Sequence, residues 1–352
     1  MKEKNVRLAH QSVTENRDGL SLNFAVNSNP MGVPAAVKEA MCNMAELAGA
    51  YPDPDCRVLS ARLAEKYYVC AEHILCGSGA DDLLYRLVFA VKPKRAVVVE
   101  PTFEEYSRAL ELVGCDVQHY MLQPEEHFTL NEEILCAISE NCDMVFLCNP
   151  NNPTGQLADG ELLRRIADCC SRNGVLLVVD ECFMEFLPDW KNHTLKPLAG
   201  RSENLIVIDA FTKTYSLAGF RLGFCVSGNT ALLAAMRLHG QAFSVSVPAQ
   251  MAGLCALSDG EYMRRTYRLL SEEREWLLSQ LQKLPVEVFA SQANFLLLKT
   301  ADREIRQKLL EKGVKVRDCS CFHGLSSAYC RVAIRTRREN TALVENLTAV
   351  LC

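Results

Sequence analysis

Short apolar runs alternate with amphipathic stretches between about residues 75 and 240. Apolar runs rich in β-branched residues are typical of buried strands, and apolar positions three and four residues apart are typical of helices. Alternating strands and helices favour βαβ units and a mostly parallel sheet covered on both faces. The pattern predicts strands over Arg95–Val99, Asp116–Tyr120, Met144–Cys148, Val175–Val179, Leu205–Ile208 and Leu222–Val226. It predicts helices over Asp81–Val91, Glu104–Val113, Gly160–Arg172 and Thr230–His239.

A long helical stretch follows, from Pro248 to about Leu284, where Pro285 ends it. Its Arg/Glu-rich middle suits a helix that joins two domains. The remainder predicts a small α+β unit, with strands over Val286–Phe289, Asn294–Leu298, Val314–Arg317 and Cys330–Ile334 and helices over Arg303–Lys312 and Arg338–Val350. We therefore predict a large α/β domain over residues 31–283 and a small domain over residues 1–30 and 284–352.

Composition limits the classes of function. The chain has 352 residues, which is too long for one small core. A net charge of −5 and the lack of a basic run argue against nucleic acid and anionic membranes as partners. The N-terminus lacks the apolar segment of a secretory signal, and no apolar run approaches a membrane span. Seventeen cysteines, an odd number with no C-x-x-C pair, predict reduced thiols in a cytoplasmic protein and no metal site.

The motif with the most chemical content follows the strand Leu205–Ile208 and reads Asp209-Ala-Phe-Thr-Lys213-Thr-Tyr-Ser-Leu-Ala-Gly-Phe-Arg221. Lys213 thus lies just past the C-terminal end of a strand, where open α/β sheets bind ligands. Desolvation there would lower its pKa and free the amine to attack an aldehyde. Arg221 and the Thr212 hydroxyl could bind a phosphate. A lone lysine in a loop is more often a surface residue, so this motif needs support from others.

Two further strand ends carry polar side chains. Asp180 ends a buried-looking strand and could accept the N–H of a pyridinium ring, although a carboxylate there could also be a helix cap. Asn152 lies in the turn Asn149-Pro-Asn-Asn-Pro-Thr-Gly155, and its amide could donate to a phenolate oxygen.

Two weaker motifs lie earlier in the chain. Gly79 and Ala80 open a predicted helix, whose first backbone amides could hold a phosphate. Phe103 follows the next strand and could stack on a planar ring, although on its own it would be read as a core residue.

Three arginines lie near the C-terminus. Arg331 lies within the predicted strand Cys330–Ile334, and Arg335 directly follows it. The two arginines are expected on the same face, because side chains of a strand repeat every two residues. Arg317 ends another predicted strand. A guanidinium binds a carboxylate with two parallel hydrogen bonds, so one of the three should bind the α-carboxylate of a substrate. Exposed strand arginines are the alternative.

These motifs, in this order and spacing, resemble the class I/II aminotransferase superfamily, the fold type I pyridoxal-phosphate enzymes, over nearly the whole chain. The resemblance implies the fold of aspartate aminotransferase. Tyr51-Pro-Asp-Pro resembles the branch that holds histidinol-phosphate aminotransferase and L-threonine-O-3-phosphate decarboxylase. The segments Phe24-Ala-Val-Asn-Ser-Asn-Pro-Met-Gly and Tyr329-Cys-Arg-Val-Ala-Ile-Arg are more similar to the decarboxylase.

The resemblance implies pyridoxal 5'-phosphate as cofactor and a homodimer. Lys213 would be the catalytic Schiff-base lysine, and Asp180 would pair with the pyridine nitrogen. The other cofactor contacts would be made by Asn152 to the ring hydroxyl oxygen, by Phe103 stacked on the ring, and by Gly79, Ala80, Thr212, Arg221 and Tyr51 of the second subunit around the phosphate. Arg331 would bind the substrate carboxylate, and the candidates for a substrate phosphate are Arg317, His10 and Asn29.

Three departures from the family pattern leave the reaction open. The chain has His10-Gln-Ser where the decarboxylases carry His-Gly-Gly, Ala210 where the family prefers Ser or Thr, and His323-Gly-Leu in place of Pro-Gly-Leu. One hypothesis is decarboxylation of a small phosphorylated amino acid such as threonine phosphate, a step of cobalamin biosynthesis. The alternative is transamination of a histidinol-phosphate-like amine or an amino acid. A cofactor-binding regulator would need a DNA-binding segment, and no basic domain remains outside the fold.

Overall fold

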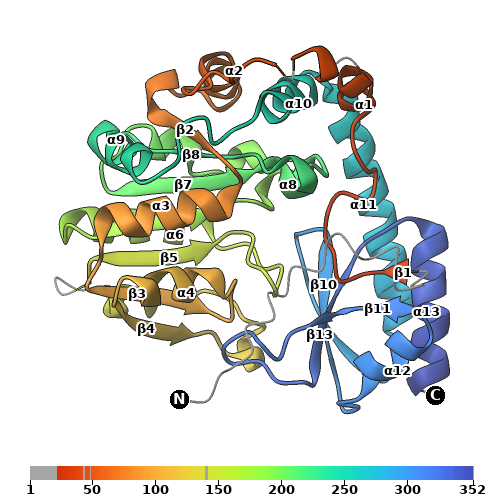
Figure 1. The fold of residues 1–352 in the computed structure, drawn as a ribbon. Coiled ribbons are helices and arrows are strands. Elements are labelled where there is room, and N and C mark those ends of the chain that lie inside the picture. The colour runs from red at the N-terminus through yellow and green to blue at the C-terminus, as the bar shows by residue number, and fades with distance from the viewer. Residues whose placement is uncertain (1–21, 43, 48, 139–141, 352) are drawn as a thin grey trace, which may run out of the picture.

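The computed structural model describes residues 22–42, 44–47, 49–138 and 142–351. A seven-stranded sheet forms the centre of the large unit (Figure 1). Its strands, in spatial order, are β2 (Ile74–Gly77), β8 (Gly223–Val226), β7 (Leu205–Ala210), β6 (Leu176–Asp180), β5 (Met144–Cys148), β3 (Arg95–Glu100) and β4 (Asp116–Met121). All neighbours pair in parallel except β8, which runs antiparallel to both β2 and β7. This is the mostly parallel sheet that the sequence predicts.

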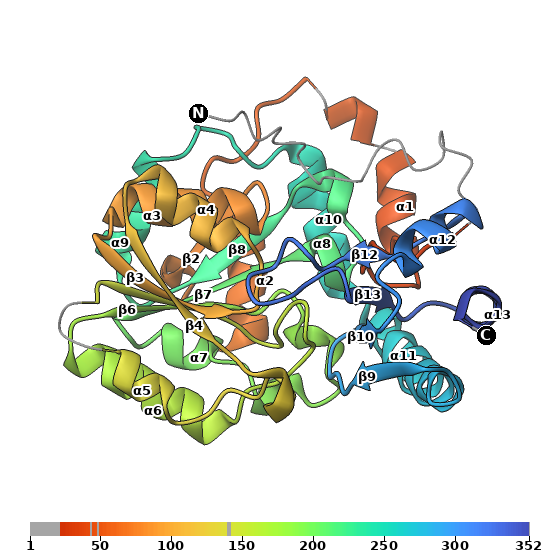
Figure 2. The same ribbon diagram turned by 90° about the horizontal axis from the view of Figure 1, so that it is seen from below.

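Helices cover both faces of this sheet, because successive side chains of a buried strand point to opposite sides. In β5, Val145 and Leu147 enter one apolar layer, and Met144 and Phe146 enter the other. Figure 2 shows one face covered by α3 (Ala80–Val91), α4 (Glu105–Leu112) and α9 (Thr230–Leu238). The opposite face is covered by α5 (Ile134–Ala137), α6 (Gly160–Arg172) and α7 (Lys196–Ala199).

The C-terminal part forms a second unit around a four-stranded antiparallel sheet. The strand order is β12 (Arg317–Asp318), β13 (Tyr329–Ala333), β10 (Phe295–Thr300) and β9 (Val286–Phe289). Its helices are α11 (Gly260–Leu281), α12 (Ile305–Glu311) and α13 (Arg337–Leu351), and side chains of all three enter one apolar core. The N-terminal strand β1 (Leu22–Asn23) pairs with β11 (Val314–Lys315), as expected for a start of the chain that packs on this unit.

Local turn chemistry accounts for the differences from the predicted elements. The helix expected over Pro248–Leu284 is two helices, α10 (Val247–Ser258) and α11, because the Asp259 side chain accepts from the Tyr262 amide and starts a new helix. The strand expected over Val314–Arg317 is divided between β11 and β12. No predicted element covers β1, β2, α1 (Ala35–Cys42), α2 (Arg57–Tyr67), α5, α7 or α8 (Phe211–Thr214). The domain boundaries at residues 30 and 283 stay a prediction.

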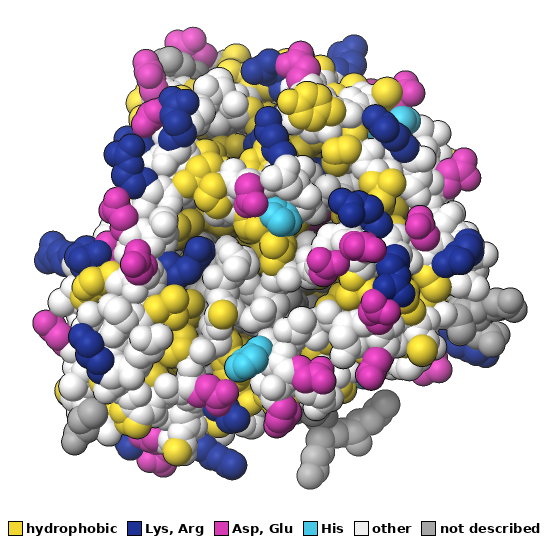
Figure 3. All heavy atoms as spheres, turned by 180° about the vertical axis from the view of Figure 1, so that it is seen from behind, with side chains coloured by type: hydrophobic (Ala, Val, Ile, Leu, Met, Phe, Trp, Pro, Cys, Tyr) yellow, Lys and Arg dark blue, Asp and Glu magenta, His cyan; other side chains and the backbone are white. Residues whose placement is uncertain are grey.

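The remaining helical elements are single 3₁₀ turns over Met44–Leu47, Ala71–His73, Pro124–Glu126, Met184–Phe186, Trp190–Asn192 and Ala218–Phe220. Among the described residues, no helix has the length and apolar character needed to cross a membrane. Every cysteine in the described ranges is a free thiol. On the face in Figure 3, basic and acidic side chains are interspersed rather than gathered by sign.

Candidate active site

Lys213 lies on the short helix α8, directly after β7 at the centre of the large sheet. Burial, together with the charge of the neighbouring Arg331, lowers the pKa of the Lys213 amine to about 8. The neutral amine is the form that attacks an aldehyde, so this position favours a covalent bond to a carbonyl group. The structure therefore places Lys213 where the sequence motif predicts a nucleophilic lysine.

Asn29 holds the backbone around this lysine. Its buried side chain donates to the Thr214 carbonyl and to the Thr266 hydroxyl, each over 2.8 Å, and its backbone N–H donates to the Lys213 carbonyl. Its side-chain oxygen accepts from the Met31 amide. Both amide hydrogens of Asn29 are thus used within the protein, which fits a positioning residue better than the predicted ligand of a substrate phosphate. His10, the other candidate, lies outside the described residues.

Asp180 lies at the C-terminal end of β6, one strand away from Lys213. Its Oδ2 accepts from the Tyr106 hydroxyl over 2.5 Å, and its Oδ1 accepts from the Cys182 amide over 2.9 Å. A carboxylate can accept about four hydrogen bonds, so Asp180 can take a further N–H. Sequence reasoning missed Tyr106, whose only signal is its place one helical turn after Phe103.

Two glycines bring an arginine and a helix N-terminus together. Gly79 has φ +96°, and a Cβ built on it would lie 2.7 Å from Nη2 of Arg221. A Cβ on Gly223 would lie 2.8 Å from the Ala80 amide nitrogen, the first residue of α3. Glycine at position 79 leaves room for the Arg221 guanidinium, and glycine at position 223 leaves room for the first amide of α3. This cradle suits a phosphate, and sequence reasoning found Gly79, Ala80 and Arg221 but missed Gly223.

Asn152 and Phe103 lie on the loops after β5 and β3. The Asn152 side-chain oxygen accepts from Nη1 of Arg331, which leaves its N–H groups to donate to a ligand oxygen. The half-buried ring of Phe103 packs edge-on against Tyr106, with centroids 5.7 Å apart. Thr212 is half-buried beside Lys213 on α8. The resemblance implies a cofactor contact for each of these three residues. Those contacts stay predictions.

Arg331 is a buried cation without an anionic partner among the described residues. Its Nη2 donates to the Ala25 carbonyl over 2.9 Å, and its Nε has no hydrogen-bond partner. Burial lowers its pKa to about 10, so the guanidinium is charged at neutral pH. A buried charge of this kind is costly unless an anion pairs with it, which points to a negatively charged ligand.

The other two arginines, Arg317 and Arg335, each lie near a carboxylate. Arg317 is the Cα partner of Arg331 on the adjacent strand, and its Nη2 lies 3.7 Å from Glu104 and 3.5 Å from the Cys321 thiol. Arg335 was expected on the same strand face as Arg331, but β13 ends at Ala333 and does not include it. Its Nε donates to Glu339 over 2.6 Å and its Nη1 donates to the Asn23 carbonyl, so it links β1 to the first turn of α13.

Tyr51 lies away from Lys213 on the surface. Its side chain is 84% exposed, and its ring contacts Phe243 with centroids 5.0 Å apart. Its role in a second subunit stays a prediction.

A buried ionic network supports the strand that leads to Lys213. The ammonium of Lys196, which is 0% exposed, lies 2.7 Å from Glu181 and 2.8 Å from Asp209 on β7. Nearby, Glu185 accepts from Lys66 over 2.7 Å. Burial raises the pKa of Asp209 to about 7, although the Lys196 charge opposes the shift.

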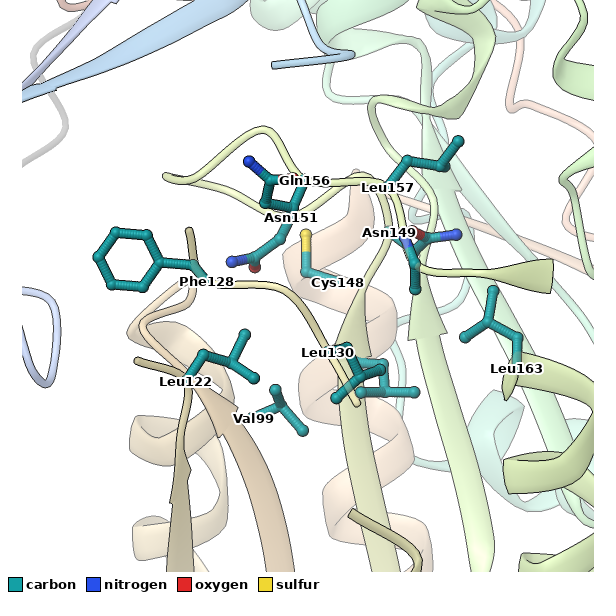
Figure 4. Close-up of a pocket in the computed structure, with 12 residues that line it drawn as sticks. Val99, Leu122, Phe128, Leu130, Cys148, Asn149, Asn151, Gln156, Leu157 and Leu163 are labelled. Atoms are coloured by element: carbon teal, nitrogen blue, oxygen red, sulfur yellow. Dashed lines mark hydrogen bonds between the residues drawn. The ribbon is translucent and has the colours of Figure 1, made fainter. Parts of the chain in front are cut away.

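A separate apolar pocket lies beside the Asn149–Gly155 turn, whose Asn149 and Asn151 help to line it (Figure 4). Val99, Phe128 and Leu163 line it, and Asn151 and Gln156 bring polar groups to one end. None of the candidate cofactor or substrate residues lines this cavity, so it is not the site that surrounds Lys213.

Three features of the structure around Lys213 fit pyridoxal phosphate. The glycine cradle suits the phosphate, Asp180 has room for a ring N–H, and the lowered pKa of Lys213 suits a bond to the aldehyde. Fold and site together define a pyridoxal-phosphate-dependent enzyme. Residues 21–347 match the model of the family "Aminotransferase class I and II". The chain belongs to this family, as a decarboxylase or an aminotransferase.

Curated relatives, which include a decarboxylase and an aminotransferase, are similar over almost the full length of this chain. Threonine-phosphate decarboxylase of Salmonella typhimurium is 36% identical over 94% of this chain and 91% of its own. Histidinol-phosphate aminotransferase of Methanosarcina mazei is 33% identical over 90% of this chain and 85% of its own. The adenosylcobalamin biosynthesis bifunctional protein CobDQ of Leptospira interrogans is 30% identical over 92% of this chain and 38% of its own.

Solved structures agree on the fold. Histidinol-phosphate aminotransferase from Clostridium acetobutylicum superposes with a TM-score of 0.88 at 24% identity, over 94% of this chain and 98% of its own. Thermus thermophilus aspartate aminotransferase with maleate gives a TM-score of 0.83 at 23% identity, over 96% and 93%. The fold is therefore that of aspartate aminotransferase, as the resemblance in sequence implies.

Proposed function

We propose that this chain is a pyridoxal-phosphate-dependent decarboxylase of a small phosphorylated amino acid, with threonine phosphate as the best candidate substrate. The observation that carries the proposal is the pair of arginines on β12 and β13. Arg331 is buried with an unpartnered Nε, and Arg317 is its direct Cα partner. Neighbouring strands lie about 5 Å apart, so two guanidiniums can bind one small ligand with two anionic groups. A ligand with one anionic group, bound to Arg331, would leave Arg317 only its 3.7 Å contact with Glu104.

In this proposal Arg331 binds the substrate carboxylate through parallel hydrogen bonds, and Arg317 binds the phosphate. Asp180 holds a proton at the ring nitrogen of the cofactor, and the Tyr106 hydroxyl orients Asp180. When bound, pyridoxal phosphate supplies an electron sink for the charge that develops at Cα. The Cα–carboxylate bond breaks and CO₂ leaves. With a pKa of about 8, Lys213 is mostly protonated at pH 7, and this ammonium form would donate the proton that replaces the carboxyl group at Cα.

The similarity to threonine-phosphate decarboxylase supports the choice of reaction, and the similarity to the CobDQ protein supports a place in cobalamin biosynthesis. We also propose that the enzyme is a cytoplasmic homodimer, in which Tyr51 contacts the cofactor phosphate of the second subunit. The 84% exposure of Tyr51 in the single chain supports this part.

Gas release separates decarboxylation from transamination. The full chain, loaded with pyridoxal phosphate, is incubated with threonine phosphate and no keto acid, and CO₂ and 1-amino-2-propanol phosphate are measured. The proposal predicts both products in equal amounts. If instead threonine phosphate is inert and histidinol phosphate loses its amino group only when 2-oxoglutarate is added, the enzyme is an aminotransferase and the proposal is wrong.

A further inference from the structure

Three side chains from distant parts of the chain meet at one edge of the large sheet. Glu100 ends β3, His119 lies on the edge strand β4, and His323 lies in the turn between β12 and β13 of the small sheet. One potential ligand atom from each lies within 4.8 Å of the other two. The group thus joins the two sheets at a place that none of the proposed cofactor residues occupies.

The two inner residues are already oriented toward each other. Oε2 of the buried Glu100 accepts from the Thr102 amide over 2.7 Å, and its Oε1 lies 3.3 Å from Nδ1 of His119. The imidazole rings of His119 and His323 are stacked, with centroids 4.1 Å apart and planes 15° apart. Glu100 therefore has one oxygen fixed by the backbone and the other directed at the histidine pair.

The turn that carries His323 is shaped to reach this edge. Gly324 has φ +80°, and a Cβ built on it would lie 2.3 Å from the Met121 side chain of β4. Glycine adopts this positive φ without strain, and the turn lies next to the flexible end of the Met121 side chain at the sheet edge. His323 itself is exposed, so its ring can adjust and solvent can reach the group.

We propose that Glu100, His119 and His323 bind one divalent transition-metal ion of the zinc class. Two imidazoles and a carboxylate suit zinc and its neighbours, whereas magnesium and calcium prefer oxygen ligands alone. Ligand atoms about 2.1 Å from a tetrahedral zinc ion lie roughly 3.4 Å apart, so the group, whose atoms lie within 4.8 Å of one another, has to contract by up to about 1.4 Å. An imidazole binds a metal through a lone pair in its ring plane, so the exposed His323 ring also has to turn out of its stack on His119. Water would fill the fourth position.

The bound ion would clamp the turn between β12 and β13 to the edge of the large sheet. The same turn carries the packing partners of Arg317, because the Arg317 guanidinium lies over the Phe322 ring and donates to the Cys321 thiol. Sequence spacing did not predict a metal site, since 19 residues separate Glu100 from His119 and 204 separate His119 from His323. The proposal departs from that expectation and does not depend on the reaction that the enzyme performs.

The test is zinc binding by the full chain, loaded with pyridoxal phosphate and first freed of metal with a chelator. Equilibrium dialysis against Zn²⁺ compares the native protein with His119→Gln and His323→Ala. The matched control is His193→Gln, because His193 forms a similar pair with Asp189, at 3.0 Å, without a third ligand. Substitution of Co²⁺ for Zn²⁺ then reports the ligands, since cysteine thiolates give a charge-transfer band that imidazoles and carboxylates lack.

We expect one zinc ion per chain at micromolar affinity in the native protein and in the control, and binding weaker by at least about tenfold in both cluster variants. Zinc should raise the melting temperature of the native protein but not that of His323→Ala, whose exposed turn keeps the metal-free fold intact. If His119→Gln fails to fold, His323→Ala decides alone. Equal binding in native and His323→Ala proteins, a thiolate band with Co²⁺, or no binding up to about 0.1 mM Zn²⁺ would overturn the proposal.

Discussion

Arg317 on β12 and Arg331 on β13 are direct Cα partners across two antiparallel strands of the small sheet. Arg331 is buried, with Nε unpartnered, and Arg317 is half-buried beside Glu104. Two cations on adjacent strands repel each other unless anions lie between them. The two arginines of the small sheet therefore predict a substrate with two anionic groups.

Arg317→Ala should weaken the use of threonine phosphate far more than that of unphosphorylated threonine, since only the former offers a second anion. Arg331→Lys should lower kcat/KM for both by about tenfold or more, because an ammonium lacks the planar fork that binds a carboxylate. The control is Arg338→Ala on the exposed side of α13, which should match the native enzyme. Equal effects of Arg317→Ala on the two substrates would contradict the assignment of the phosphate to Arg317.

The lowered pKa of Lys213 predicts how cofactor attachment depends on pH. With a pKa of about 8 instead of 10.5, the neutral amine is roughly one tenth of the total at pH 7, rather than about one in 3000. Because the neutral amine attacks, the rate of covalent attachment to cofactor-free enzyme should rise with pH through a midpoint near 8. Rapid mixing with absorbance detection measures this rate.

Arg331→Gln is the companion experiment. It removes a positive charge that lowers the pKa of Lys213, so the midpoint should move to higher pH. A native midpoint above pH 10, or one that Arg331→Gln leaves in place, would show that burial and Arg331 do not tune this lysine.

The buried Lys196 predicts a stability effect. Lys196→Met leaves Glu181 and Asp209 buried without their shared cation, which should lower the free energy of unfolding by about 3–5 kcal/mol. Lys191→Met, on the exposed surface nearby, should change it by less than about 0.5 kcal/mol. Denaturant unfolding of the three proteins measures both values, and similar midpoints for all of them would mean that the network contributes little.

The exposed Tyr51 predicts a shared active site. Mixed subunits of Lys213→Ala and Tyr51→Phe, each inactive or nearly so alone, should recover part of the activity, because a hybrid dimer contains one site with both residues intact. Activity assays before and after subunit exchange measure the recovery. A fully active monomer in light scattering, or mixtures no better than their parts, would contradict the dimeric site.

Elements with strong local signals could be predicted from the sequence. Strand Met144–Cys148 and helix Gly160–Arg172 have the predicted bounds, because the strand is apolar throughout and Asp159 caps the helix by accepting from two backbone amides. The four-residue strand β2 could not be predicted, since so short a run has no distinct period. The helical pattern of apolar residues continues across Asp259, so it does not reveal the helix cap at that position.

In the candidate site, too, the residues with a local signal in the sequence could be predicted. Lys213, Asp180 and Asn152 lie directly after strands, so chain order alone brings them to one edge of the sheet. The contacts of Tyr106, Asn29 and Arg335 depend on tertiary packing, which one sequence does not reveal. The hydroxyl of Tyr106 and the amide of Asn29 find their partners across 74 and 185 residues of chain.

Borohydride reduction followed by peptide mapping tests the central claim most directly. The purified, yellow holoenzyme is reduced, digested and analysed by mass spectrometry for the lysine that carries the reduced cofactor. Lys213→Ala, with its fold checked by circular dichroism, serves as the control and should retain no covalent cofactor. The account predicts a single modified peptide containing Lys213. Modification of any other lysine, or none in a protein that holds the cofactor, would contradict it.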